Sequence, residues 1–267
     1  APWSPRVRQT DGSISAPDAP WVVGCPSMNG LVAHLQADLR VRFGRAVAAI
    51  ERCPDGWRAL DEAGTSLGTG EKLVLAIPAP QSARLLQPHE DAFRGSPGPE
   101  IGRRLADVGV EATWTLMIDG VDRDPGFDVA VDPNESIRWL AREASRPDRP
   151  DHGAWTMHAS PSWTERHLEL AKEEVEPLLR ALAADVLGAE LRAGDVHRWR
   201  FGLTTEPLGT SHLRSDDGSL LICGDWCLGG RVEHALESGI AAAGAVLRDP
   251  GAAVLDEGVG LLFGEVG

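Results

Sequence analysis

The segment Leu221–Gly239 constrains the fold of this chain more than any other stretch of its sequence. It reads L-I-C-G-D-W-C-L-G-G-R-V-E-H-A-L-E-S-G, which predicts a short apolar strand, a glycine-containing loop and a helix that begins at Arg231. A carboxylate at the end of a strand, here Asp225, can accept hydrogen bonds from sugar hydroxyls, and Gly229-Gly230 lets the backbone approach a flat ligand closely. The first turn of the helix adds unpaired N–H groups and the positive end of the helix dipole. The pattern therefore predicts a strand–loop–helix that binds a ligand with an electron-rich edge.

Two kinds of hydrophobic pattern alternate along the rest of the chain. One combines short apolar strands with helices, as in α/β domains; we expect its strands at residues 45–52, 57–61, 72–77 and 219–223, and its helices at 27–39, 81–86 and 231–247. The other alternates with a period of two, which is typical of strands that turn one face toward a core or a cavity. Its strands are expected at 112–119, 153–159 and 195–202, with helices at 135–144 and 164–187, the second interrupted near Pro177.

These patterns predict an α/β plus α+β fold, in which a partial Rossmann-like, nucleotide-binding domain contains an inserted antiparallel-sheet domain. The Rossmann-like domain is expected to comprise residues 24–86, which include a β-meander, and the strand–loop–helix of residues 218–249. The inserted substrate domain is expected to comprise residues 87–217 together with the N-terminal segment 1–23, and residues 250–267 form a tail.

Charge and cysteine content limit the partners of the chain. Its formal net charge is −14, from 40 acidic and 26 basic residues. Such a surface repels phosphate backbones, so we expect no nucleic-acid partner, and an anionic small ligand would need local cations or helix N-termini. No stretch reaches the roughly 18–20 apolar residues that a membrane span needs, so we expect no membrane association. The absence of C-x-x-C predicts reduced thiols in a cytoplasmic protein, with a Cys223–Cys227 redox pair as the alternative; the cysteines are Cys25, Cys53, Cys223 and Cys227.

The strand–loop–helix resembles the C-terminal flavin motif of renalase-like FAD-dependent oxidoreductases, which belong to the flavin amine oxidase superfamily. The resemblance implies FAD as the cofactor, with Asp225 at its ribityl or pyrophosphate region and the backbone N–H of Val232 at the flavin O2. Gly224, Arg231 and Glu233 would shape the loop. The N–H groups of the helix suit the isoalloxazine edge that gains negative charge on reduction. An ordinary strand–turn–helix with an anion at its helix N-terminus is the alternative explanation.

Other stretches support the same resemblance. Residues 45–57 and 73–86 resemble the three-stranded meander of the family, in which the backbone of Val47 would contact the adenine and Ala76 and Pro78 would lie near the cofactor. Residues 21–35 resemble its Gly-x-Pro-x-Met segment, and the stretches more particular to renalase-like proteins are 136–150, 154–163 and 196–202. The resemblance extends over nearly the whole chain, up to about residue 248.

One departure from the family concerns the G-x-G-x-x-G loop, which seats the FAD pyrophosphate on a helix N-terminus. No glycine cluster of this kind follows a strand early in the chain, which opens with A-P-W-S-P and without Met. A full-length relative would carry that unit before residue 1. We therefore expect a truncated chain that binds FAD weakly or not at all by itself.

The resemblance implies hydride transfer to FAD, and then to O2, from a small dihydronicotinamide-type substrate: an isomer of NAD(P)H, and so a possible dinucleotide. This chemistry belongs to the flavin and needs no protein nucleophile or metal, in keeping with the lack of G-x-S-x-G, H-E-x-x-H and P-loop motifs in the sequence. The alternatives are a flavin-containing amine oxidase or desaturase, and a cofactor-free fragment or binding module. The oligomeric state is left open.

Aromatic and basic side chains are the candidates for a substrate site. His197 and Trp199 share one face of their predicted strand, so we expect both to act at the catalytic cavity, where an aromatic wall would hold a planar ring against the flavin. Further candidates for the wall are Trp114, Trp155 and His158. Core packing is the alternative for all of these side chains. Cations for substrate phosphates, or else a solvated surface cluster, are expected from Arg142, Arg146 and Arg149.

Overall fold

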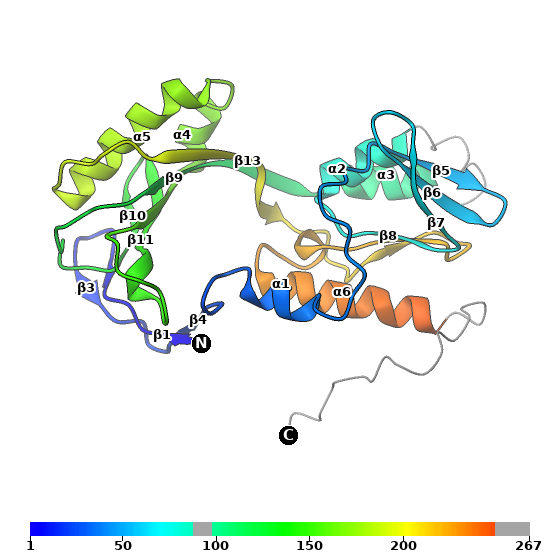
Figure 1. Ribbon diagram of the computed structural model, residues 1–267, viewed down its shortest axis with the longest axis horizontal. Coiled ribbons are helices and arrows are strands. Elements are labelled where there is room, and N and C mark those ends of the chain that lie inside the picture. The colour runs from blue at the N-terminus through cyan, green and yellow to red at the C-terminus, as the bar shows by residue number, and fades with distance from the viewer. Residues whose placement is uncertain (88–97, 249–267) are drawn as a thin grey trace. The chain divides into compact units, whose positions relative to one another are not determined.

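The computed structural model describes residues 1–87 and 98–248, which pack into two compact units (Figure 1). One unit comprises Ala1–Phe43 and Val110–Leu203, and the other comprises Gly44–Gly109 and the chain from Thr204 onward. Residues 24–43, which the sequence placed in the Rossmann-like domain, lie in the first unit. The chain has a mixed α/β fold with several sheets, as the hydrophobic patterns predicted.

The first unit is built on a seven-stranded sheet with the order β13-β9-β12-β11-β10-β2-β3. The pairs β9–β12, β12–β11 and β11–β10 are antiparallel, whereas β10 and β2 run parallel. In sheet order the strands span Asp195–Glu206, Gly109–Ile118, Trp155–Ala159, Ile137–Arg142, Val129–Asn134, Val7–Arg8 and Ile14–Ser15.

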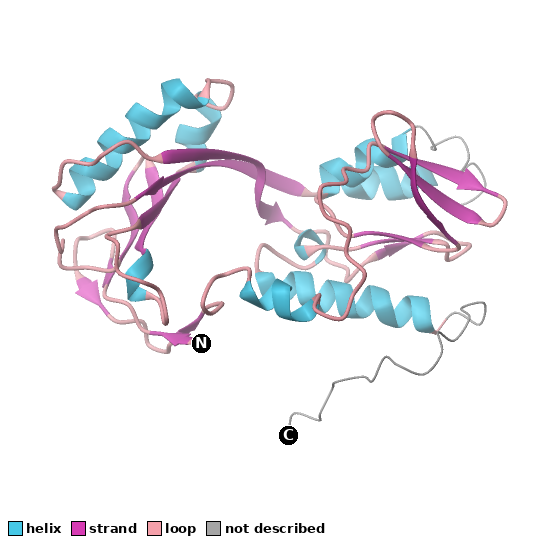
Figure 2. Cartoon of the chain, viewed as in Figure 1, coloured by secondary structure: helices cyan, strands magenta, loops and turns pink. Residues whose placement is uncertain are grey.

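Two helices, α4 (Pro161–Arg166) and α5 (Lys172–Leu187), cover one face of this sheet (Figures 1 and 2). The period-two alternation of the strands directs every second side chain to this face, and α5 contributes one apolar side chain per turn. The shared core includes Trp114, Leu116, Ile118, Trp155, Met157, Val175, Leu179, Ala183 and Leu187. The indole Nε1 of Trp114 donates to the carbonyl of His167 at 3.0 Å, so the polar atom of this core residue is also paired.

The opposite face of the sheet is covered only in part. The short pair β1 (Pro2–Trp3) and β4 (Trp21–Val22) packs against β10 and β11 through a second core of Trp3, Val7, Val23, Val129 and Ala141. The rest of this face carries the alternate residues of β9, β12 and β13, of which Thr115 is buried. We call it the open face, and its members are Thr115, Met117, Thr156, His158, His197, Trp199 and Phe201. Met117, Trp199 and Phe201 are exposed, which leaves apolar surface in contact with solvent.

The second unit contains two three-stranded sheets. One has the order β14-β15-β8, with β15 antiparallel to β14 and parallel to β8. The other is the antiparallel meander β5-β6-β7. The strands span Leu213–Arg214, Leu220–Ile222 and Leu73–Leu75 in the first sheet, and Ala49–Cys53, Gly56–Leu60 and Ser66–Gly70 in the second; the helices are α2 (Ala79–Leu86), α3 (Gly98–Ala106) and α6 (Val232–Leu247).

Local patterns located most elements of the second unit well. β5, β6, β8, α2, β15 and α6 occur where the sequence predicted them, although several strands are shorter than expected. The third meander strand was predicted wrongly, because β7 fills that place and the strand expected at 72–77 is β8 of the other sheet. The turn between the first two meander strands, Pro54-Asp55-Gly56, connects β5 to β6 as expected. The helix expected at 27–39 shortens to α1 (Gly30–Leu35), which lies in the first unit. The predicted tail 250–267 falls outside the described residues.

Two expectations for the first unit were wrong. Residues 135–144 do not form a helix; they contain β11 and the 3-10 helix Glu143–Ser145. The buried residues of β11 are Ile137, Leu140 and Ala141, whose spacing of i, i+3 and i+4 resembles that of a helix, because a register shift between Ile137 and Trp139 interrupts the period-two alternation. Pro177 does not interrupt a helix either, since it lies inside α5, and the break falls between α4 and α5 instead. The four buried residues of α5 offset the single hydrogen bond that this proline removes.

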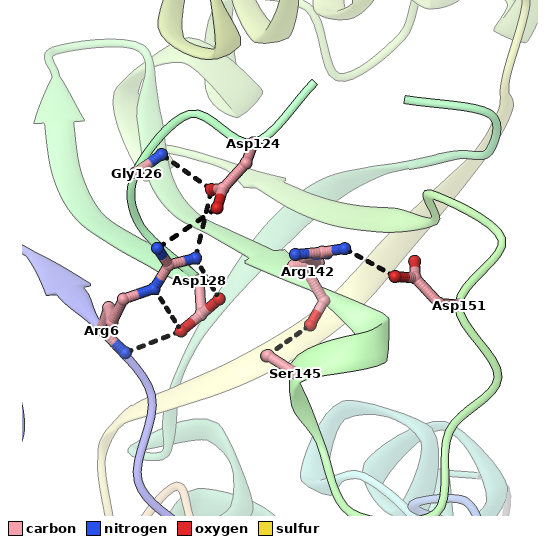
Figure 3. Close-up of polar contacts among 7 residues, drawn as sticks. All are labelled: Arg6, Asp124, Gly126, Asp128, Arg142, Ser145 and Asp151. Carbon is pink, nitrogen blue, oxygen red and sulfur yellow. Dashed lines mark hydrogen bonds and ion pairs between the residues drawn. The ribbon is translucent and has the colours of Figure 1, made fainter. Parts of the chain in front are cut away.

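Arg6 anchors the N-terminal segment to the sheet of the first unit (Figure 3). Its Nε and Nη2 donate to the carboxylate of Asp128 at 3.1 and 2.9 Å, and its backbone N–H donates to the same carboxylate at 2.9 Å. The guanidinium also donates to Asp124, whose carboxylate accepts from the backbone of Gly126. Burial opposes ionisation of Asp128, but the hydrogen bonds from Arg6 outweigh it and lower the pKa of this carboxyl.

Replacing Arg6 with glutamine is expected to lower the free energy of unfolding by about 1 kcal/mol at pH 7, because a paired and partly buried carboxylate loses its partner. The folded-state pKa of Asp128 is depressed. The stabilisation is therefore complete above the ordinary carboxyl pKa of about 4 and is lost as the pH falls through the lowered value. Urea unfolding of both proteins at several pH values measures the difference in the free energy of unfolding.

Arg58→Gln, which breaks the exposed pair with Glu51, serves as the control and is expected to change stability less. A difference that persists at pH 2 would contradict the assignment.

Candidate functional site

In the second unit, two parallel strands end side by side at the predicted ligand-binding loop. β8 and β15 pair in the register Leu220↔Leu73 to Ile222↔Leu75. Their carboxyl ends lead into Ala76-Ile77-Pro78 and Gly224-Asp225, and the indole Nε1 of Trp226 donates to the carbonyl of Ile77 at 3.0 Å. The carboxyl edge of neighbouring parallel strands is where ligands bind in α/β sheets. The structure thus brings the predicted residues Ala76, Pro78, Gly224 and Asp225 to one edge of one sheet.

Gly224 joins this strand edge to α6 through a buried serine. Its backbone N–H donates to Ser238 Oγ at 3.0 Å, and the same hydroxyl donates to the carbonyl of Ser211 at 2.6 Å. Ser238 is fully buried. A Cβ at position 224 would lie 2.4 Å from Trp226 Nε1, so only glycine fits between the indole and the strand end. The start of the loop is therefore fixed from both sides.

The loop closes on Asp225 and leaves the start of α6 uncapped. The carbonyl of Asp225 accepts from Leu228 N and Gly229 N at 2.9 and 2.8 Å. Among the described residues its carboxylate has no hydrogen-bond partner and is half-buried. No side chain caps α6 at Arg231, so the N–H groups of its first turn, at Val232 and Glu233, remain available beside the loop. A free carboxylate and free amides thus adjoin the same strand end.

His234 supplies one more donor at this loop. The guanidinium Nη2 of Arg231 lies 3.3 Å from His234 Nε2, and because a guanidinium only donates, Nε2 must accept and the proton must be on Nδ1. Nδ1 is buried and has no partner within residues 1–87 and 98–248. It lies against Gly229, which has φ +156° and where an added Cβ would be 2.4 Å from Nδ1. An unpaired buried donor, two glycines that cannot carry a Cβ and uncapped amides fit a flat ligand with acceptor atoms on one edge.

The remaining predicted cofactor residue lies in a different sheet. Val47 precedes β5 of the meander and is 40% exposed, but it does not belong to the sheet of β8 and β15. Its predicted contact with adenine stays a prediction.

In the first unit, His197 and Trp199 lie on the open face, as their spacing predicted. Their ring centroids are 4.2 Å apart, and Trp199 is 50% exposed. The residues between and beside them point the other way: Val196 enters the core, and Arg198 lies over the ring of Trp114. The two side chains therefore form one accessible aromatic surface.

His158 of β12 lies on the same open face, two strands away from β13. Its Nδ1 is 2.8 Å from the hydroxyl of Thr115. Burial and the nearby charges of Arg146 and Arg138 lower the pKa of His158 below its ordinary value. The imidazole is therefore neutral at pH 7, and it suits a neutral polar group better than an anion.

Trp114 and Trp155 are not part of a cavity wall. Both lie in the core under α4 and α5, with relative exposures of 0% and 1%. Each occupies a strand position whose side chain points to the helix-covered face, whereas His158, His197 and Trp199 occupy the alternate positions.

Sequence reasoning missed Thr115, Ser238 and His234. The period-two pattern that located Trp114 would have placed Thr115 on the other face of the same strand. Ser238 and His234 gave no comparable signal, because their contacts join residues that only the folded loop brings together.

Two further classes of site find no support in the part of the chain that the structure describes. No helix there is both long and apolar enough to cross a bilayer. No group of three or more histidine, cysteine, aspartate or glutamate side chains there is arranged to hold a metal ion.

The chain matches one protein family by its sequence, and it resembles solved structures in its fold. Residues 6–247 match the family model for flavin containing amine oxidoreductases. A crystal structure from Exiguobacterium sp. 255-15, named as a candidate protoporphyrinogen oxidase, has a TM-score of 0.58 and 17% identity over 82% of this chain and 50% of that one. An oxidoreductase from Methanosarcina mazei has a TM-score of 0.51 and 15% identity over 75% of this chain and 48% of that one. The chain thus spans about half the length of these structures, and at such identities the likeness concerns the fold.

Replacing Gly229 with alanine is expected to destabilise the protein by about 1–3 kcal/mol, because the new Cβ would meet the His234 ring and the backbone angle disfavours a side chain. Adding His234→Ala is expected to recover only part of this loss, since the ring is gone but the backbone strain remains. Urea unfolding followed by tryptophan fluorescence measures all three proteins. Gly239→Ala is the matched control in α6, where a Cβ meets nothing within 4 Å, and it is expected to be neutral or stabilising. A Gly229→Ala protein as stable as the wild type would show that the ring lies elsewhere.

Proposed function

Because the chain belongs to the flavin containing amine oxidoreductase family, we propose that this FAD-dependent oxidoreductase oxidises a dihydronicotinamide-type substrate, an isomer of NAD(P)H, in the manner of renalase-like enzymes. The observation that carries the proposal is the open face of the seven-stranded sheet. It combines an exposed aromatic pair, His197 and Trp199, with a neutral histidine, His158. This combination suits a flat, uncharged ring that bears a polar carboxamide.

The residues of the second unit fit FAD. When bound, the cofactor accepts a hydride from a substrate carbon and returns two electrons to O2, which yields hydrogen peroxide. The free carboxylate of Asp225 would accept hydrogen bonds from the ribityl or ribose hydroxyls. The N–H groups of Val232 and Glu233 and the Nδ1–H of His234 would donate to the acceptor edge of the isoalloxazine ring. Gly224 and Gly229 let the backbone approach closely.

The residues of the first unit would bind and orient the substrate. The rings of His197 and Trp199 would stack on the dihydronicotinamide and exclude water from one side of it. His158 takes one hydrogen bond with Thr115 through Nδ1, which leaves Nε2 for the carboxamide of the substrate. A neutral imidazole performs this role without the cost of burying a charge. No side chain in this arrangement has to act as a nucleophile.

The decisive experiment uses the purified full chain, with FAD added. With FAD in excess, so that even weak binding loads the protein, we expect bound flavin whose absorption is bleached, under exclusion of oxygen, by a dihydronicotinamide isomer and not by simple amines. Bleaching by amines alone would indicate an amine oxidase. A protein that takes up no FAD would indicate a cofactor-free binding module.

Asp225→Asn is expected to weaken FAD binding about tenfold, because a neutral amide is a poorer hydrogen-bond acceptor for the cofactor hydroxyls than a carboxylate. Fluorescence titration with FAD measures this. Asp185→Asn, which changes an exposed aspartate on α5, is the matched control and is expected to bind FAD as the wild type does. Equal affinity in both variants would remove Asp225 from the cofactor site.

Trp199→Ala is expected to raise the KM for the dihydronicotinamide substrate about fivefold, through the loss of one stacking interaction of about 1 kcal/mol. The affinity for FAD is expected to stay unchanged, since Trp199 does not belong to the unit that holds Asp225. Steady-state kinetics and FAD titration on the same preparation measure both quantities. An unchanged KM would exclude the open face as the substrate surface.

A further inference from the structure

Glu143 gathers two cations at the edge of the open face. Its carboxylate accepts a hydrogen bond from Arg146 Nη1, another from Arg149 Nη1 at 2.6 Å and a third from the hydroxyl of Thr156 at 2.8 Å. Burial opposes its ionisation, but the hydrogen bond and charge of Arg146 outweigh this and lower the pKa of Glu143, which is therefore anionic at pH 7. Two guanidinium groups share one carboxylate, which leaves one positive charge in excess.

The neighbouring charges do not cancel this excess directly. Arg142, the third arginine of the predicted cluster, is paired with Asp151 at 2.7 Å, so the two neutralise each other (Figure 3). Asp148 lies in the same loop and accepts a hydrogen bond from the Cys25 thiol at 2.9 Å, and its exposed carboxylate is solvated. The sequence analysis predicted one cluster of three arginines, whereas in the structure Arg142 has a different partner from Arg146 and Arg149.

Three buried donors around this pair lack an acceptor. The Nε atoms of Arg146 and Arg149 are buried without a hydrogen-bond partner among the described residues, and so is the indole Nε1 of Trp3. The guanidinium carbon of Arg146 lies 5.1 Å from the centre of the Trp3 ring, so these two side chains are in contact. Buried donors without acceptors are rare in folded proteins because they lose their hydrogen bonds to water. All three unmet groups here are donors, and an acceptor would satisfy them.

The cation pair borders the predicted substrate surface. Thr156, which holds Glu143, and His158 occupy alternate positions of β12 and so face the same way. The charge of Arg146 is one of the causes of the lowered pKa of His158, which indicates that the two side chains are near each other. The side chains of Arg146 and Arg149 are 12% and 17% exposed, so both keep some contact with solvent.

We propose that Arg146 and Arg149, together with Trp3, form an oxyanion-binding subsite that takes a phosphate or carboxylate group of the substrate. Arginine suits this role because its planar guanidinium donates two parallel hydrogen bonds to such groups. Glu143 acts as a positioning residue that fixes both guanidinium groups in place. The part of this inference that assigns the anion to the substrate rests on the function proposed above.

Thermal unfolding of the full chain in inorganic phosphate or pyrophosphate tests the subsite without FAD or turnover. Because a ligand that binds only the folded state raises the melting temperature, we expect a rise with either anion and none with chloride at equal ionic strength. Arg146→Gln and Arg149→Gln are expected to lose most of the rise. Arg200→Gln, which removes a cation paired with Glu169 away from the open face, is the matched control and is expected to keep it. An equal rise in chloride, or a full rise in the Arg146 and Arg149 variants, would overturn the proposal.

Lysine variants keep the test valid if the glutamine variants fail to fold. Arg146→Lys and Arg149→Lys retain the charge that Glu143 requires and lose the guanidinium fork. Each is expected to bind pyrophosphate about fivefold more weakly than the wild type by calorimetry. Unchanged affinity in both lysine variants would contradict a site built on two arginine forks.

Two further measurements identify the chemical group that supplies the anion. If it is a phosphate of the substrate, Arg146→Gln raises the KM for a dihydronicotinamide mononucleotide about tenfold and leaves the KM for the phosphate-free riboside unchanged. If it is a carboxylate, succinate displaces pyrophosphate and neither KM changes. Both results support the subsite, and failure of both anions to bind refutes it.

The same measurements separate the subsite from the proposed substrate. A phosphate-dependent rise in the melting temperature without reduction of the flavin would refute the proposed substrate alone. Reduction of the flavin without that rise would refute the subsite alone.

Discussion

The candidate cofactor site of the second unit depends on the hydrogen bond from the Gly224 backbone to Ser238. Ser238 is fully buried inside α6 and also donates to the carbonyl of Ser211, so one hydroxyl ties together the end of β15, the middle of α6 and the segment before β14. Because a buried hydroxyl that loses one partner leaves another polar group unpaired, the three segments are stabilised together. The carboxylate of Asp225 and the amides of Val232 and Glu233 are brought to one place by this contact.

The first unit depends on a different constraint, the division of one sheet into two unlike faces. α4 and α5 cover one face and build the main core on it, so apolar side chains such as Trp114 and Trp155 contribute to stability there. The other face is only partly covered by the N-terminal segment. The residues at the alternate positions of the same strands, which include His158 and Trp199, do not pack under α4 and α5. A single strand thus contributes to the core with one face and to a candidate binding surface with the other.

The sequence predicted what local patterns determine. The order of strand, Gly-Asp loop and helix at residues 219–247 was recovered because each of its signals lies within a few residues of the next. The helix expected at 135–144 was wrong because the buried residues of β11, which are Ile137, Leu140 and Ala141, have the spacing of a helix in the sequence. Period-two spacing grouped His197 with Trp199 correctly, but it could not tell that Trp114 faces the core, since alternation does not say which face is covered. The contacts of His234 and Glu143 depend on the folded loops, and no spacing rule predicts them.

The acidity of the chain gives the pairing of Arg146 with Arg149 its significance. With a formal net charge of −14, the surface as a whole repels anions, and screening at physiological salt limits that repulsion to about 8 Å. Two partly buried cations at the edge of a sheet can therefore attract an oxyanion only at short range, where burial weakens the screening. Glu143 holds the two guanidinium groups together against their mutual repulsion, and its single charge leaves them unbalanced. A site of this kind selects one anion over another by its local geometry, because the electrostatic field of the protein as a whole attracts no anion.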